Sequence, residues 1–375
     1  MARKSLRFIA AALIIAYLAL IPTYLSGRLE RNYYNEWMQG EQEPFTGVIT
    51  CWHIVGFKTY AGSLSSWLEK RAARVEKKHF GVFVTIEAMS VEDCMERLSK
   101  GERADIYSFP SGWCGEDMLL ELTEQPEAVF LDGIERSGKS EDKQYAIPYV
   151  LSGYALLVNS QIAQARSVDS IPDDPTKDGW LLDAAQKMTF TQGKKKEQVY
   201  GICGDPVILA SLGVKAQSAE FDAFKDKLAG SAVVDARAAG DLLRKLELGQ
   251  GFVFQLSTIT NYTDLVQYMG LDRQIEEGKI PYAMELMRQV VDEGPQENLA
   301  GLGGIPAIVL NEDPSFTSEL PQKLYQALKK PRVPNTFSLY RMKESLRQAA
   351  VSAVSGDESG VSEFNRIFKE LVNMP

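Results

Sequence analysis

Histidine is scarce in this sequence: only His53 and His79 occur among 375 residues. A Ser-His-Asp or Cys-His arrangement would have to use His53, since His79 ends a charged helical stretch, and no G-x-S-x-G element accompanies it. The glycine-rich residues 301–304 lack the lysine and the Ser or Thr of a phosphate-binding loop and do not match G-x-G-x-x-G. A catalytic pair of carboxylates for glycoside hydrolysis cannot be judged from the sequence. The chain has 50 acidic residues, and only the distance between two of them in space would identify such a pair. We therefore expect that the protein is not an enzyme.

Cysteine is also scarce, and the four residues at positions 51, 94, 114 and 203 have neither CxxC nor CxxH spacing. A zinc framework therefore has little support. Cys51 and His53 would point to the same side of a strand and could share a metal ion, but two ligands do not make a site. We expect small buried thiols, no metal and no cofactor, and we leave open one disulfide between Cys94 and Cys114.

Positive charge is in deficit, with 41 Lys and Arg residues against 50 Asp and Glu residues and a formal net charge of -9. Lys194 to Lys196 form a basic tract without interleaved aromatic residues, whereas binding to a nucleic-acid backbone needs clustered cations. The sequence therefore predicts no nucleic-acid partner. Its 45% apolar and 24% charged residues are typical of globular proteins, and 375 residues suit about two domains.

Basic residues at positions 3, 4 and 7 precede an apolar stretch at 8–25, which is long enough to cross a bilayer as a helix. Their position predicts that the N-terminus stays in the cytoplasm and that the rest of the chain is extracytoplasmic, at the outer face of the cytoplasmic membrane. Residues 1–27 are either a cleaved signal peptide or a retained signal anchor. Ser26-Gly27 lacks the A-x-A pattern of a signal-peptide cleavage site. We therefore favour the retained anchor, followed by a linker at 28–46.

From residue 48 onward, strand-like and helix-like segments alternate. The pattern predicts strands at 48–56, 82–86 and 104–109 and amphipathic helices at 62–78 and 91–98. This alternation predicts an α/β fold whose parallel sheet carries helices on both faces. Each strand then ends at the same edge of the sheet, which is where open α/β sheets bind their ligands.

Two apolar runs farther along the chain, 144–150 and 152–159, are joined through Gly153. We interpret them as a pair of strands that cross between two lobes, with Gly153 free to absorb a hinge rotation. A plain hairpin inside one domain is the alternative. A helix at 235–248 and a strand at 251–256 then return the chain towards the first lobe.

Four segments, in this order and spacing, resemble the extracellular solute-binding proteins of ABC importers, in particular the class that includes maltose-type and other sugar binders. They are Ile49-Thr50-Cys51-Trp52-His53, then Lys100-Gly101-Glu102-Arg103-Ala104-Asp105-Ile106, then Tyr145-Ala146-Ile147-Pro148-Tyr149 running into 153–159, and Tyr262-Thr263-Asp264-Leu265-Val266-Gln267-Tyr268 with 296–299 downstream. The resemblance spans residues 47–300.

The resemblance implies a two-lobed periplasmic-binding-protein-like fold with a multi-strand hinge, preceded by the N-terminal transmembrane or signal helix. The N-terminal lobe would comprise 47–151 and 262–305, and the C-terminal lobe 152–261 and 306–375. The implied function is capture of a sugar, oligosaccharide or similar polar solute in the interlobe cleft by domain closure, and its delivery to the transmembrane permease subunits of an ABC importer. A membrane-anchored ectodomain that senses a ligand for a signalling partner is the alternative, and a carbohydrate-active enzyme is the more remote one.

A sugar site needs flat aromatic faces for the C–H surfaces of the rings and hydrogen-bonding groups around their rims. We expect the faces to come from Trp52, Trp113, Tyr149 and Tyr154, and the rim groups to come from His53, Asp105 and Asp241. For Trp52 and Tyr154 the alternative role is packing in a core, and for Asp105 it is a turn partner at the start of a strand.

Overall fold

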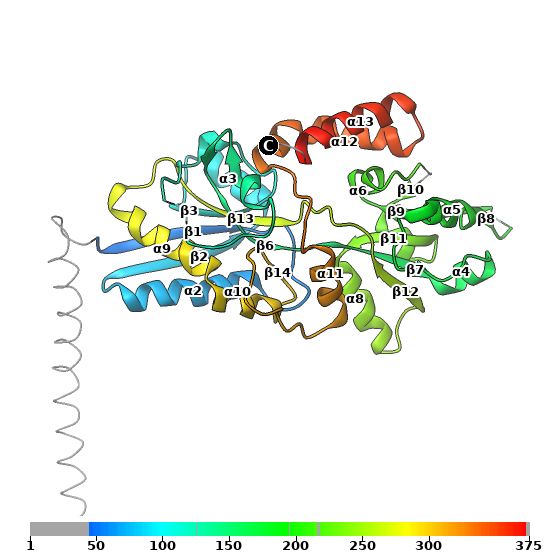
Figure 1. The fold of residues 1–375 in the computed structure, drawn as a ribbon, viewed down its shortest axis with the longest axis horizontal. Coiled ribbons are helices and arrows are strands. Elements are labelled where there is room, and N and C mark those ends of the chain that lie inside the picture. The colour runs from blue at the N-terminus through cyan, green and yellow to red at the C-terminus, as the bar shows by residue number, and fades with distance from the viewer. Residues whose placement is uncertain (1–44, 125, 195, 216–217, 373–375) are drawn as a thin grey trace, which may run out of the picture.

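The computed structural model of the chain describes residues 45–124, 126–194, 196–215 and 218–372. These residues form two lobes that lie side by side along the long axis of the molecule, each built around its own sheet (Figure 1). Within them, no helix combines the length and the apolar character that crossing a bilayer requires. The anchor expected at 8–25 lies outside the described residues.

The sheet of the first lobe has the strand order β14-β6-β13-β3-β1-β2. Its strands are β1 (Gly47–Ile54), β2 (Val82–Met89), β3 (Ile106–Pro110), β6 (Ile147–Leu151), β13 (Val266–Leu271) and β14 (Ile305–Pro306). β1, β2 and β3 are parallel, as the alternation with helices predicts, whereas β13 returns from the second lobe and runs antiparallel to β3 and β6. The sheet is therefore mixed and not wholly parallel, because its later strands enter from the hinge side.

Helices cover both faces of this sheet. They are α2 (Leu64–Lys78), α3 (Val91–Ser99), α9 (Ile280–Val291) and α10 (Glu293–Ala300). Leu68 and Val75 of α2 pack with Met287 of α9 in one hydrophobic core. On the other face, the Arg97 guanidinium of α3 covers the indole of Trp52 at 4.2 Å. Both faces of the central strands are consequently buried.

The sheet of the second lobe has the order β10-β9-β11-β7-β12, with β8 beside β9. Its strands are β7 (Tyr154–Asn159), β8 (Phe190–Gln192), β9 (Glu197–Gly204), β10 (Ser218–Ala219), β11 (Ala229–Asp235) and β12 (Phe254–Thr258). Its helices are α4 (Ser160–Ala165), α5 (Trp180–Lys187), α6 (Pro206–Ser211), α7 (Phe221–Lys225) and α8 (Ala236–Glu247). Asp205 and Asp235 begin α6 and α8, because each carboxylate accepts a backbone N–H of the first helical turn.

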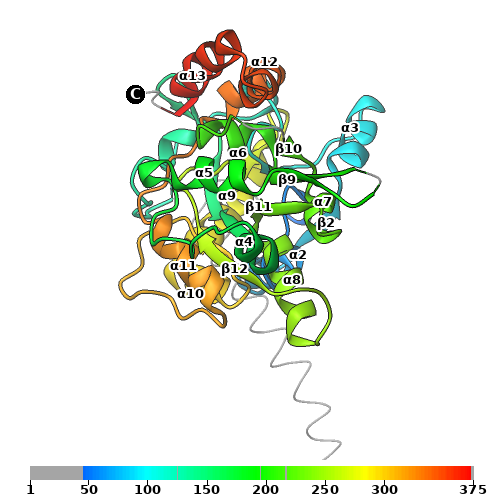
Figure 2. The same cartoon turned by 90° about the vertical axis from the view of Figure 1, so that its right-hand side faces the viewer.

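The chain ends in a helical hairpin, α12 (Thr336–Val354) and α13 (Glu358–Val372), which packs on α6. Figure 2 looks onto the second lobe, with this hairpin above it and α8 and α11 (Glu319–Ala327) below. The remaining elements are the small hairpin β4 (Lys139–Ser140) with β5 (Lys143–Gln144) and 3-10 turns at Glu116–Met118, Glu135–Gly138, Lys177–Gly179 and Glu277–Lys279.

The hinge consists of the chain segments that follow β6, β12 and α11. The Thr263 hydroxyl donates to the Ser152 carbonyl oxygen at 2.6 Å, and the Arg332 N–H donates to the Asn261 carbonyl oxygen at 2.8 Å. These bonds hold the segments side by side. Because β6 and β7 belong to different sheets, the run through Gly153 does cross between the lobes, and the alternative of a plain hairpin is excluded.

The four cysteines are buried free thiols. The disulfide left open between Cys94 and Cys114 is therefore not formed in this structure. Burial raises the pKa of the Cys51 thiol to about 12, so this group is neutral and packs as a small apolar side chain.

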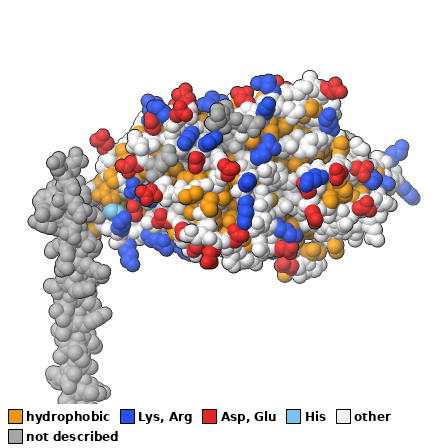
Figure 3. Space-filling view, in the orientation of Figure 1, with side chains coloured by type: hydrophobic (Ala, Val, Ile, Leu, Met, Phe, Trp, Pro, Cys, Tyr) orange, Lys and Arg blue, Asp and Glu red, His pale blue; other side chains and the backbone are white. Residues whose placement is uncertain are grey.

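Acidic and basic side chains are interspersed over both lobes on the face shown in Figure 3. That face therefore carries no continuous basic surface of the kind that binds a phosphate backbone.

Candidate functional site

The carboxyl ends of the parallel strands in both lobes face the space between the lobes. In the first lobe, β1 and β3 are followed by the loops 55–63 and 111–115, and in the second lobe β9 and β11 lead into α6 and α8. The first of these loops contacts α8, and the second contacts α12. Because open α/β sheets bind ligands at this edge, the interlobe region is the candidate site.

On one side of the hinge, Tyr60 from the loop after β1 packs against α8. Arg237 and Arg244 of α8 each donate a hydrogen bond to the Tyr60 carbonyl oxygen, at 3.3 and 3.4 Å, and the Arg244 guanidinium lies 5.8 Å from the tyrosine ring. Gly240 permits this approach, since a Cβ there would lie 2.5 Å from Tyr60 Cε2. Asp241 pairs with both arginines and so orients them. We call these five residues the Tyr60 latch.

On the other side of the hinge, the start of α12 contacts the loop after β3. The Gly112 N–H donates to Thr336 Oγ1 at 2.9 Å in a buried hydrogen bond, and Arg341 pairs with Glu116 at 2.8 Å. A Cβ at Gly112 would lie 2.9 Å from Leu339 Cγ, so the glycine allows close contact here too. The lobes thus touch above and below the hinge in the view of Figure 1, and we refer to this arrangement as closed.

A polar cluster lies at the hinge itself. The Tyr154 hydroxyl donates to Asp264 Oδ1 at 2.6 Å, and the buried Tyr262 hydroxyl has no hydrogen-bond partner among the described residues. Burial raises the pKa of the Asp264 carboxyl, and the negative charge of Asp205 raises it further, while the Tyr154 hydrogen bond and the positive charge of Lys343 oppose the shift. We call these five residues the hinge cluster.

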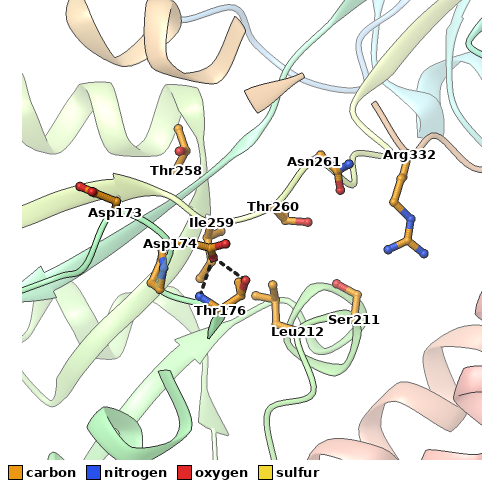
Figure 4. Close-up of a pocket in the computed structure, with 11 residues that line it drawn as sticks. Asp173, Asp174, Thr176, Ser211, Leu212, Thr258, Ile259, Thr260, Asn261 and Arg332 are labelled. Carbon is orange, nitrogen blue, oxygen red and sulfur yellow. Dashed lines mark hydrogen bonds between the residues drawn. The ribbon is translucent and has the colours of Figure 1, made fainter. Parts of the chain in front are cut away.

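Two surface cavities adjoin the hinge. One of about 490 Å³ is lined by the loop 173–176, by Ser211, by residues 258–261 and by Arg332 (Figure 4). The other, of about 1060 Å³, lies between the β4–β5 hairpin and the start of α12, and Arg332 lines it as well. Neither cavity is lined by a residue that the sequence singled out as a ligand contact.

The structure places three of the four expected aromatic faces inside the first lobe. Trp52 is 2% exposed and meets Tyr107 edge-on at 6.0 Å, and Trp113 is 7% exposed and lies 5.4 Å from the same ring. Tyr149 is fully buried and stacks on Trp67 at 5.9 Å. In this closed arrangement their rings contact other side chains and present no flat face to the space between the lobes.

His53 is also interior. Its Nδ1 shares a hydrogen bond with Ser108 Oγ at 2.8 Å, and burial lowers the pKa of the imidazole to about 4. The neutral ring therefore belongs to a buried polar network, which Gln267 extends by donating to Ser108 Oγ. Because Trp52 and His53 alternate on β1, one faces each covered side of the sheet.

Asp105 lies at the opposite end of β3 from the interlobe edge, since it precedes the strand. It accepts the Thr50 N–H at 2.8 Å and pairs with Lys279 at 3.0 Å, so its contacts join β1 to the segment before α9. The structure thus separates Asp105 from the other expected site residues.

Tyr154 and Asp241 are the two expected residues that the structure places at the contact between the lobes, in the hinge cluster and in the Tyr60 latch. Sequence reasoning missed Tyr60, and it did not assign a binding role to Tyr262 or Asp264, although both lie in a segment that carries the family resemblance. No local pattern distinguishes Tyr60, because its role depends on Gly240, 180 positions away.

The fold matches solved sugar-binding proteins over most of the chain. The GacH receptor of Streptomyces glaucescens, solved unliganded and with acarbose, is 15% identical, with a TM-score of 0.58 over 88% of this chain and 99% of the other. The cyclic alpha-maltosyl-1,6-maltose binding protein from Arthrobacter globiformis is 12% identical, with a TM-score of 0.61 over 88% and 98% of the two chains. This chain has the fold of the extracellular solute-binding proteins. An extracellular solute-binding protein from Staphylococcus aureus in complex with maltose agrees, at 14% identity and a TM-score of 0.58 over 87% and 98%.

The likeness to the solute-binding proteins is one of fold. In sequence, no family model matches the chain and no curated protein does. The expected two-lobed α/β fold is confirmed by the two sheets, by the hinge and by these structural matches.

Proposed function

We propose that the chain is the extracytoplasmic receptor of an ABC importer, which encloses a small carbohydrate or similar polar solute between its lobes and delivers it to a permease. One observation carries this proposal. The strands of the two sheets end on either side of a hinge, and the hinge contains buried polar groups. Proteins of the same fold have been solved with acarbose and with maltose, which supports a carbohydrate ligand.

Closure of the lobes supplies the mechanism. A solute that touches both lobes favours the closed arrangement, because part of its contacts exists only there. Release requires the Tyr60 latch and the Gly112–Thr336 hydrogen bond to open. The polar contacts in the latch involve half-exposed arginines, so a permease that competes for them would favour opening.

The N-terminal segment supplies the location in this proposal. The apolar stretch at 8–25, kept as an anchor, holds the receptor at the outer face of the membrane beside its permease. An uncleaved anchor is equally compatible with a sensing ectodomain, which uses the same lobe closure but transfers no solute. Uptake of labelled solute into cells that carry the receptor and the permease distinguishes the importer receptor from the sensor. Deletion of the chain should abolish uptake if it is the receptor and leave uptake unchanged if it is a sensor.

The binding test uses the full-length chain in detergent micelles. Titration calorimetry across a panel of mono- and oligosaccharides is expected to give saturable heat with at least one class, and chromatography is expected to recover that ligand unchanged. A panel that gives no heat would refute the proposal, and a converted ligand would show an enzyme instead.

A further inference from the structure

The first halves of β1 and β2 carry an exposed apolar pair on one face of the first sheet. Val48 and Phe83 are partners in the register of the two strands, and they are 47% and 59% exposed. Trp52 lies four positions after Val48 and therefore points to the same face, where the Arg97 guanidinium of α3 covers it. α3 thus covers this face at Trp52 and leaves the Val48–Phe83 pair open.

The length of α3 explains why the face is only partly covered. α3 has 9 residues and β2 has 8, which correspond to about 14 Å of helix and about 26 Å of strand. Arg97 also pairs with Glu87, the register partner of Trp52, so the helix lies over the second halves of the strands. The Val84 N–H at the outer edge of β2 donates to Glu76 Oε1 at 2.9 Å. A further element would therefore pack on the open face and not pair with β2 at Val84.

The segment 28–44 is joined to the chain beside this face. It lies outside the described residues and directly precedes Phe45, whose ring packs on Tyr282 at 5.9 Å. The Phe45 ring also lies against Gly47, the first residue of β1. In Figure 1 the described chain begins at the end of the first lobe that is distant from the second lobe. The segment 28–44 therefore ends only four positions before Val48.

The sequence of this segment has the pattern of an amphipathic helix. Its apolar and aromatic residues would share one side of a helix over 28–39, and they are Leu29, Tyr33, Tyr34, Trp37 and Met38. Asn35 and Gln39 would lie on the other side, and Gly40 and Pro44 are typical of the end of a helix. Twelve helical residues span about 18 Å, which is enough to cover the part of the strands that α3 leaves open.

We propose that residues 28–39 form a helix that packs its apolar side on Val48 and Phe83. This inference goes beyond the proposed function, because it concerns a contact within the chain and no solute. The contact would fix the orientation of the first lobe relative to the apolar stretch at 8–25, while the second lobe stays free to move during closure.

Pairs of introduced cysteines test the contact in the full-length chain in detergent micelles. Thr85→Cys places a thiol at an exposed position two residues after Phe83, on the same face of β2. Combined with Tyr33→Cys, it is expected to form an intramolecular disulfide at least fivefold faster than with the matched control Asn35→Cys. The four native thiols are buried, so Thr85→Cys alone gives the background. Equal rates for the two pairs would overturn the proposal, and a disulfide-linked dimer would place the segment on a second copy instead.

Hydrogen exchange of residues 28–39 tests the role of the apolar pair. Phe83→Asp is expected to speed this exchange at least tenfold, because it places a charge under the helix. Val309→Asp, at a valine that is 54% exposed after β14, is the matched control and should change nothing. Unchanged exchange in Phe83→Asp would overturn the proposal, since a helix that merely continues from 8–25 would be protected without the patch.

The fluorescence of Trp37 distinguishes the first lobe from the membrane surface as the partner of the apolar side. Its emission is the difference between the unmodified chain and Trp37→Phe, both reconstituted in vesicles of brominated phosphatidylcholine. Trp37 packed on the lobe is expected to keep its emission, as in vesicles of unbrominated lipid. Loss of half of its emission or more would place the apolar side in the bilayer interface and overturn the proposal.

Discussion

Gly240→Ala should hold the two lobes apart. The new Cβ would lie 2.5 Å from Tyr60 Cε2 and 2.8 Å from Cδ2, well inside van der Waals contact. The tyrosine carbonyl oxygen is held by Arg237 and Arg244. Relief therefore requires the lobes to move.

The size of the effect follows from two opposing terms. Overpacking by one carbon costs roughly 1–3 kcal/mol, and this cost exists only while the lobes are closed. Alanine in a helix interior is favoured over glycine by about 1 kcal/mol, and this gain applies to the open and the closed arrangements alike. The closed-to-open ratio should therefore fall by about 5- to 150-fold.

Small-angle scattering of the full-length chain measures this shift directly. Gly240→Ala is expected to raise the radius of gyration and to lengthen the maximum dimension. Gly294→Ala on α10 is the matched control, since it makes the same change in a helix where a Cβ would meet no atom within 4 Å. Addition of Tyr60→Ala to Gly240→Ala removes the ring that the methyl group meets, so the double variant should close again.

An unchanged scattering curve for Gly240→Ala would refute the reasoning, since it would mean that Tyr60 adjusts within the closed arrangement. Expansion of the Gly294→Ala control to the same degree would likewise exclude a specific contact at α8.

Three further predictions concern stability. Trp52→Ala should lower the unfolding free energy by about 3–5 kcal/mol in a denaturant titration, because it empties a core site. Phe83→Ala, the control at an exposed aromatic residue, should lower it far less. Equal losses in the two variants would contradict the placement of Trp52 in the core. His53 has a folded pKa of about 4 against 6.5 for an ordinary histidine, so the unfolded chain binds more protons between these values and stability is lost as pH falls from 6.5 to 4. His53→Asn should remove about 3 kcal/mol of this loss of unfolding free energy at acid pH. A plot of unfolding free energy against pH that runs parallel to that of the unmodified chain would contradict this prediction. Thr336→Val should cost about 1–3 kcal/mol by leaving the Gly112 N–H buried without an acceptor, and a loss below the error of the titration would show that water replaces it.

Much of the fold could be predicted from local sequence. The apolar run at 48–56 corresponds to β1, and the helical pattern at 62–78 corresponds to α2. The two runs joined at Gly153 do lie in different sheets. Such features follow from side-chain periodicity and turn residues, which act over a few positions. The direction of β13 could not be read in this way, because antiparallel pairing with β3 depends on where the chain returns from the second lobe.

The site was harder to predict, because exposure is a property of the assembled layers. Alternation along β1 placed Trp52 and His53 on opposite faces, but only the packing of α3 and α2 shows that both faces are covered. Asp105 directly precedes β3 and so lies at the end of that strand that points away from the space between the lobes. Local sequence could not decide this, because strand order and direction determine which ends meet.

The sequence by itself determined the kinds of elements, their order and the crossing between two sheets, because these depend on periodicity and on residues a few positions apart. Tertiary structure alone decided which polar groups meet at the hinge. Tyr60 meets Gly240, and Tyr154 meets Asp264, across 180 and 110 positions of the chain. Contacts at such separations are set by the packing of whole lobes, and no short pattern in the sequence records them.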